Sequence, residues 1–199
     1  MRKLGLQAIY AKPRTTIANK NHQKFPYLLR DLEINQANQV WSVDITYIKT
    51  PRGFAYLVAL IDIFSRFVVS AKLSISMDTG FCLEILAKAL EQQRPNIINS
   101  DQGSQFTSNE WVNSLTSNDI KISMDGVGRW ADNIYIERFW RTIKQEEIYI
   151  NPSDNLTDLN NQIIKFIEFY NYQRPHQSLK YLTPSQVFYS DNARRKKIF

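Results

Sequence analysis

Residues 40–48 read VWSVDITYI, a stretch in which apolar side chains alternate with more polar ones. Successive side chains of a β-strand point to opposite faces, so this alternation predicts a strand. One face would carry Trp41, Val43, Ile45 and Tyr47, and the other would carry Ser42, Asp44, Thr46 and Ile48. The strand would therefore direct the carboxylate of Asp44 to its more polar face.

Turn signals and changes of hydrophobic period divide the rest of the chain into elements. Strands over 55–63 and 66–73 follow at close spacing after turn signals at 51–53 and 65–66, and this spacing favours an antiparallel meander. The later elements are helices over 78–90, 108–115, 133–147 and 156–171, strands over 96–100 and 120–124, and a short helix that starts at 183–184. The order βββαβαβα predicts an α/β fold with a mixed five-stranded sheet flanked by helices, followed by carboxy-terminal helices.

The composition narrows the class of protein. With 199 residues, 43% of them hydrophobic, the chain can bury one real core or one core plus a small appendage, so we expect one main domain. The 25 Lys and Arg residues outnumber the 19 Asp and Glu residues. The resulting net charge of +6 and pI of about 9.4 favour a polyanionic partner, although an ordinary basic surface explains such a charge about as often.

The chain shows no sign of a membrane or secreted protein. Its single cysteine, Cys82, cannot form an internal disulfide, so we expect a reducing, cytoplasmic setting. No apolar run approaches the ~18 residues of a membrane span, and the first residues contain no long apolar segment followed by a cleavage site.

Composition and period also predict the domain boundaries. Residues 1–38 are polar and basic with little periodicity, which is typical of a leader or linker. We expect the catalytic core over 39–150, a helical extension of that core over 151–190, and a basic tail over 191–199.

Three acids fall where such a fold would bring them together. Asp44 lies inside the first strand, Asp101 closes the apolar run of the fourth, and Glu137 follows 35 residues after Asp101 (137 − 101 − 1) in a helical stretch. In a ribonuclease H-like layout these positions converge. The spacing alone is weak evidence, because 19 acids offer many accidental triples, and the alternative is that each acid only caps a helix or is solvated.

Converging carboxylates suit divalent metal ions. Mg²⁺ prefers oxygen ligands and retains several waters, so carboxylates together with substrate phosphate oxygens can hold it. Two such ions about 3.5 to 4 Å apart assist an in-line phosphoryl displacement without a protein nucleophile. Without metal, the gathered carboxylates repel one another, and we expect at least one raised pKa.

Neighbouring residues have two interpretations each. Gly103, Ser104 and Gln105 could form a tight loop that lets a polyanionic substrate approach the metals, or a plain turn from strand to helix, and the two are compatible. Asn133 could line the site or cap the following helix, and capping is favoured.

Several basic residues are candidates for phosphate contacts. Arg141 and Lys144 lie four and seven residues after Glu137, on the same helix face, where they could hold phosphates near the metals or could simply be solvated. We expect Arg129 and Arg138 to contribute to the same basic surface.

Longer stretches of the sequence resemble a known family. The stretches are PYLLRDLEI (26–34), NQVWSVDITYI (38–48), FAYLVALIDIFSR (54–66), NSDQGSQFTS (99–108), DNIYIERFWRTIKQEE (132–147) and YNYQRPHQSLKYLTP (170–184). Together they resemble the integrase-type catalytic core of DDE transposases from small bacterial insertion sequences, in particular the second-reading-frame protein. One departure is Lys180, which stands where glycine is common in the family.

The resemblance implies a function and a set of partners. It implies DNA cleavage at element ends followed by strand transfer, with divalent metal held by Asp44, Asp101 and Glu137. The metal would be two Mg²⁺ ions per site, with Mn²⁺ as a substitute. The partners would be DNA at the element ends and at the target, with a homo-oligomer assembled on that DNA and no membrane.

The first residues leave alternatives open. MRKLGLQAIYAKPRTT resembles the end of a helix-turn-helix region that precedes such cores, so we expect a chain truncated at its amino terminus. A truncated noncatalytic DNA-binding remnant, or a ribonuclease H-type nuclease that cuts without joining, are the alternatives to an active transposase.

Overall fold

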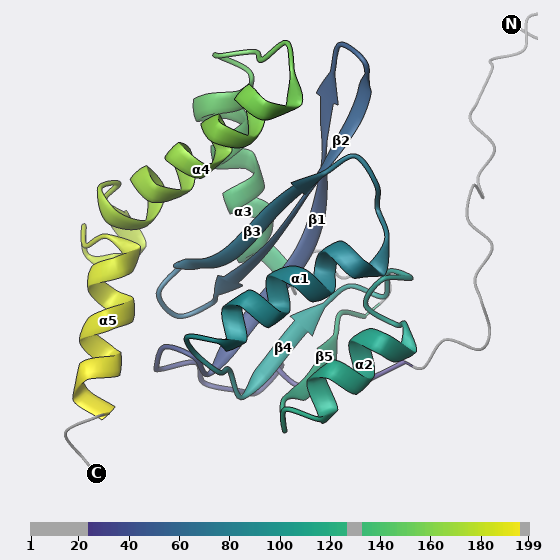
Figure 1. Cartoon of the computed structure of the whole chain (residues 1–199). Coiled ribbons are helices and arrows are strands. Elements are labelled where there is room, and N and C mark those ends of the chain that lie inside the picture. Colours follow the sequence, from purple (N-terminus) through teal and green to yellow (C-terminus); the bar gives the residue numbers. More distant parts are fainter. Residues whose placement is uncertain (1–23, 127–132, 196–199) are drawn as a thin grey trace, which may run out of the picture.

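A five-stranded mixed sheet forms the centre of the computed structural model, which describes residues 24–126 and 133–195 (Figure 1). Its strands are β1 (Val40–Thr50), β2 (Gly53–Asp62), β3 (Val68–Ser74), β4 (Ile97–Ser100) and β5 (Lys121–Met124), in the order β3-β2-β1-β4-β5. The first three strands are antiparallel neighbours, whereas β4 pairs parallel with β1 and β5 parallel with β4. The predicted meander and the predicted mixed sheet are both confirmed.

Helices cover both faces of the sheet (Figure 1). On one face, α1 (Thr79–Leu90) and α2 (Asn109–Thr116) bury a core that includes Trp41, Val43, Phe81, Leu86, Trp111 and Leu115. On the other face, α3 (Ile134–Ile143) and α4 (Leu156–Tyr172) bury a core that includes Ile48, Ala59, Ile136, Phe139, Ile143 and Phe166. The alternation in 40–48 thus divides β1 between two cores, with Asp44 on the α3 side.

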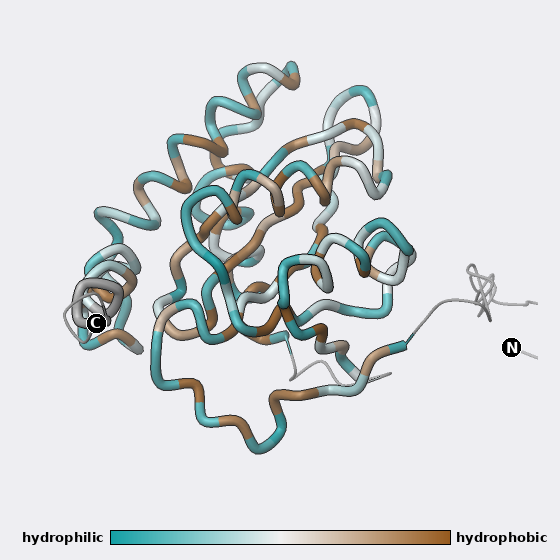
Figure 2. The backbone as a smooth tube through the Cα atoms, turned by 60° about the horizontal axis from the view of Figure 1, so that its bottom comes forward, coloured by the Kyte–Doolittle hydropathy of each residue, from teal (hydrophilic) through white to brown (hydrophobic). Residues whose placement is uncertain are grey.

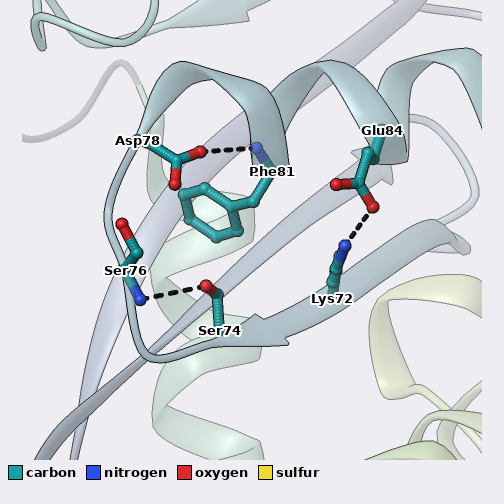
Figure 3. Close-up of polar contacts among 6 residues, drawn as sticks. All are labelled: Lys72, Ser74, Ser76, Asp78, Phe81 and Glu84. Atoms are coloured by element: carbon teal, nitrogen blue, oxygen red, sulfur yellow. Dashed lines mark hydrogen bonds and ion pairs between the residues drawn. The ribbon is translucent and has the colours of Figure 1, made fainter.

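The helices α1 and α2 begin where their capping residues stand. The Asp78 carboxylate accepts a hydrogen bond from the Phe81 amide at 3.0 Å, and the Ser108 hydroxyl accepts one from the Trp111 amide at 3.2 Å. An ion pair between Lys72 of β3 and Glu84 of α1 joins helix and sheet beside the first cap (Figure 3). The predicted starts of both helices are therefore confirmed.

The helix predicted over 133–147 changes its geometry before its end. After α3 the chain forms a π turn, η3 (Lys144–Ile148), in which the Tyr149 amide donates to the Lys144 carbonyl at 2.9 Å. In a continuous α-helix, Ile148 would point about 140° away from Ile143. The wider π turn returns Ile148 towards that face, and both side chains are buried in the same core.

The carboxy-terminal helix is longer than the short helix predicted there. A 3₁₀ turn, η4 (Gln177–Leu179), leads to α5 (Pro184–Arg195), a helix of 12 residues. Phe188 of this helix stacks on Phe67 with ring centroids 4.5 Å apart, which attaches α5 to the turn before β3. Lys180 has φ of 54° in the intervening turn, a left-handed conformation that favours glycine.

The described part of the predicted leader packs against the sheet. Residues 24–38 contain no helix or strand, and hydrophobic positions alternate with hydrophilic ones along them (Figure 2). Leu29 is buried in a small core with Val40, Ile63 and Ile97. The Leu28 amide donates to the Ser123 hydroxyl at 3.0 Å, and the Met124 amide donates to the Pro26 carbonyl at 3.4 Å. The domain boundary at residue 38 stays a prediction.

No helix within residues 24–126 and 133–195 combines the length and the apolar character that a bilayer crossing requires.

Asn171 ties α4 to the edge strand β3. Its side chain accepts from the Val68 amide at 2.9 Å and donates to the Val68 carbonyl at 3.0 Å, and Asn171 itself is buried. We expect Asn171→Ala to lower the free energy of unfolding by about 2 kcal/mol, because two buried backbone groups lose their partner. Chemical denaturation measures this, with Asn161→Ala on the exposed side of α4 as control. Equal effects of the two substitutions would contradict the assigned role.

Candidate active site

Asp44 and Asp101 lie at the same level of two neighbouring strands. In the parallel ladder of β1 and β4, Ser42 pairs with Asn99, an offset of 57 residues (99 − 42). Asp44 and Asp101 are separated by the same number (101 − 44), and Asp101 directly follows the last residue of β4. The register of the sheet therefore brings the two acids side by side.

Three side-chain hydrogen bonds hold α3, the helix that carries Glu137, along the polar face of β1. The Ser42 hydroxyl donates to Asn133 Oδ1 at the start of the helix. Trp140 Nε1 donates to Asp44 Oδ2 at 2.9 Å. Farther along, Lys144 Nζ donates to Thr46 Oγ1 at 2.6 Å. The order of these contacts is the same along both elements, so the strand and the helix run in the same direction.

Glu137 lies between these contacts, in the first turn of α3. Its side chain is exposed, as is that of Asp101, whereas Asp44 is half-buried. The site therefore combines one sheltered carboxylate with two that face solvent.

Asn133 does not cap α3, although capping was the favoured interpretation. It occupies the N-cap position without a side-chain hydrogen bond to the helix. Its carbonyl oxygen is used instead by Ser42, whose hydroxyl is completely buried. A buried hydroxyl without a partner is costly, and Asn133 provides that partner.

The carboxylate of Asp44 is difficult to ionise. Its pKa is raised from 3.8 to about 6, chiefly by burial. Hydrogen bonds from Trp140 and the Ile45 amide lower the pKa, and the negative charges of Asp101 and Glu137 add smaller increases. The expected rise is therefore found at Asp44, but burial contributes more to it than repulsion. Asp44 is near enough to both other acids to be affected by their charge.

The three acids do not form a closed metal cage. Among the described residues, no group of three His, Cys, Asp or Glu side chains is arranged to hold one metal ion. Hard oxygen donors on three elements nevertheless match the chemistry of Mg²⁺, which takes few carboxylates and completes its shell with waters and phosphate oxygens. The donor set fits an open site in which water and substrate supply the remaining ligands.

The loop after β4 fixes the side chain of Asp101. The Gly103 amide donates to Asp101 Oδ1 at 2.9 Å, and a Cβ added at Gly103 would lie 2.9 Å from that same oxygen. Ser104 is exposed, whereas Gln105 is buried and donates to the Met77 carbonyl at 3.1 Å. These contacts describe a turn from strand to helix, and the approach of DNA to it stays a prediction.

The structure separates the predicted basic residues. Lys144 is close to the acids, and burial lowers its pKa while the charge of Asp44 opposes that change. Arg141 is exposed and lines a cleft together with Arg138, beside the acids and not among them. Arg129 lies outside the described residues.

Three contacts of the site were not predicted from the sequence. These are the hydrogen bond from Trp140 to Asp44, the partnership of Ser42 with Asn133, and that of Thr46 with Lys144. The alternation in 40–48 places Ser42, Asp44 and Thr46 on one face, but it does not show which helix residues meet them.

Comparison with known proteins gives consistent matches. Two family models described as "Integrase core domain" match residues 34–129 and 118–184. The chain is 33% identical over 191 residues to the transposase for insertion sequence element IS904 of Lactococcus lactis, covering 91% of this chain and 76% of that protein. It is 32% identical over 160 residues to the putative transposase InsK for insertion sequence element IS150 of Escherichia coli, covering 79% and 56%.

Solved structures share the fold. A chain of the simian T-cell lymphotropic virus intasome in complex with PP2A regulatory subunit B56 gamma has a TM-score of 0.70 at 22% identity, covering 85% of this chain and 60% of that one. The HTLV-2 integrase catalytic core domain in complex with magnesium (dimeric form) has a TM-score of 0.63 at 24% identity, covering 77% and 97%. These matches confirm the ribonuclease H-like fold.

The raised pKa of Asp44 predicts a dependence of stability on pH. A carboxyl group whose folded pKa is above its unfolded value favours folding below the unfolded pKa, and this contribution is lost as pH rises through the folded pKa. We therefore expect Asp44→Asn to gain stability over the wild type by about 2 kcal/mol between pH 4 and pH 7 in EDTA, from a pKa of 3.8 raised to about 6. Urea unfolding at several pH values measures this. A stability difference that stays constant over that range would show that the Asp44 carboxyl is not perturbed.

Proposed function

Because the chain belongs to the transposases of bacterial insertion sequences, we propose that it catalyses metal-dependent DNA cleavage and strand transfer with Asp44, Asp101 and Glu137 as the metal ligands. The observation that supports this most directly is the register of β1 and β4, which sets the half-buried Asp44 level with Asp101, while Trp140 of the helix that carries Glu137 donates to Asp44. The three acids come from a strand interior, a strand end and a helix, on one side of one sheet.

Divalent metal is part of this proposal. Bound Mg²⁺ or Mn²⁺, with two ions per site, would activate an attacking oxygen and stabilise the leaving oxygen of the phosphodiester. Asp44, Asp101 and Glu137 would hold the metal, whose positive charge would compensate the ionised form of Asp44 that burial disfavours.

The remaining residues orient these ligands. Trp140 holds one oxygen of Asp44, and Gly103 holds one oxygen of Asp101. Lys144 adds a positive charge on the same side of β1, where it is able to attract a substrate phosphate. The substrate class is DNA, at the element ends and at the target.

Assembly into a homo-oligomer on DNA is also proposed. The relatives in solved structures include an intasome and integrase cores described as dimeric and trimeric. The chain spans 56% to 76% of the length of the two curated relatives named above, so the activity of a whole transposase is proposed for it and not established.

Replacing any one of the acids by its amide tests the catalytic role. We expect Asp44→Asn, Asp101→Asn and Glu137→Gln each to reduce metal-dependent DNA cleavage and joining by at least about 100-fold, because each keeps its shape but loses a negative ligand. A gel assay with labelled element-end DNA and Mg²⁺ or Mn²⁺ measures both steps. Glu91→Gln, an exposed acid at the end of α1, is the matched control and should remain active. Wild-type cleavage by one of the three variants would remove that acid from the proposed site.

Metal binding should also be visible without DNA. Ions that bind only the folded protein stabilise it by mass action. At a metal concentration of about ten times the dissociation constant, the gain in the free energy of unfolding is about 1.4 kcal/mol. For a chain of this size that free energy corresponds to a rise in Tm of about 3 to 6 °C. Differential scanning fluorimetry with millimolar Mg²⁺ or Mn²⁺ measures the rise, and Asp44→Asn should lack it. Equal rises in the wild type and in this variant would indicate that the metal binds elsewhere.

A further inference from the structure

A cleft lined by arginines lies along α3, on the side of that helix next to Glu137. It has a volume of about 390 Å³ and is formed by α3, α4, the chain after α4 and the turn between β2 and β3. Its charged lining consists of Arg66, Arg138, Arg141, Arg174 and Glu146. This set is called the arginine cleft below.

The arginine cleft carries a net positive charge that the described residues do not neutralise. Four arginines and one glutamate give +3 (4 − 1). Arg174 forms a two-pronged ion pair with Glu146, at 2.6 and 2.8 Å. Within the described part of the chain, Arg66, Arg138 and Arg141 form no ion pair with an acid. Three guanidinium groups therefore remain available to an anion.

Arg66 is held in place at an energetic cost. It has φ of 65°, a left-handed conformation that is unfavourable for a side chain of this size. Its guanidinium is half-buried and lies 3.7 Å from the ring centroid of Tyr135, and it also donates to the Phe64 carbonyl at 3.2 Å. A strained backbone that supports a partly desolvated cation is typical of functional sites. These contacts preorganise a donor that no acid of the described chain occupies.

Helix geometry connects the cleft with the acids. In an α-helix, Arg141 lies about 40° around the axis from Glu137, and Arg138 lies about 100° around it. Trp140 and Lys144, which face β1, lie on the opposite side of Glu137. From Glu137 to Gln145, the last cleft residue on this side, the helix rises about 12 Å. One DNA strand places about three phosphates along that distance.

We propose that the arginine cleft binds consecutive phosphates of a DNA strand that continues away from the three acids, with Arg66, Arg138 and Arg141 as the contacts. This inference rests on the proposed function, because it takes DNA as the substrate. The cleft would hold the DNA backbone without reading bases, since guanidinium groups bind phosphate oxygens of any sequence.

DNA binding in EDTA tests the cleft separately from catalysis. Fluorescence anisotropy with a labelled duplex, between about 50 and 200 mM salt, gives both affinity and the number of phosphate contacts. The test variant is Arg66→Asn/Arg138→Gln, in which asparagine tolerates the left-handed backbone. The matched control, Lys88→Gln/Lys121→Gln, removes two exposed charges from α1 and β5. Thermal unfolding establishes that each variant is folded. Arg138→Gln/Arg141→Gln, at two exposed positions, replaces the first pair if it is not.

We expect the test variant to bind about 100-fold more weakly, about tenfold per arginine. The log-log salt slope should become shallower by about 1.8, at about 0.9 per lost contact. The control should change neither quantity by as much. A test variant with the affinity and slope of its control would overturn the cleft as a DNA site and leave the proposed function standing. A wild-type protein without measurable DNA binding would overturn both.

Discussion

The structure depends on the seating of α3 along the polar face of β1. Hydrophobic packing of Phe139 and Ile143 holds the helix against the sheet, but such packing does not fix its position along the strand. The hydrogen bonds from Ser42, Trp140 and Lys144 do, since each joins one turn of the helix to one residue of the strand face. These bonds therefore also fix the position of Glu137 along the strand.

One short helix consequently serves three surfaces. Its apolar side completes a core, its second side joins β1 and the acids, and its third side lines the arginine cleft. The acidic site and the arginine cleft therefore share one helix. The π turn that follows keeps Ile148 in the core and lets the helix end without withdrawing Lys144 from Thr46.

Local patterns were sufficient to predict the elements, because alternation, caps and turns are encoded by neighbouring residues. The strand around Asp44, the starts of α1 and α2 at Asp78 and Ser108, and the mixed sheet were all predicted correctly. Contacts between distant segments were not. The prediction that Asn133 caps α3 was wrong, because its side chain accepts a hydrogen bond from the buried Ser42 hydroxyl of β1 instead. The arginine cleft was not predicted, because its residues come from segments far apart in the sequence and hydrophobic periodicity does not show which segments meet.

Both outer strands of the sheet are occupied by the protein's own polar groups. Asn171 engages the backbone of β3, and the segment before β1 engages the backbone of β5 through the Pro26 carbonyl. Unprotected edge strands pair readily with other chains. A second copy would have to displace these groups before it could extend the sheet at Val68 or Met124. Strand addition is therefore disfavoured at these two positions, one on each edge of the sheet.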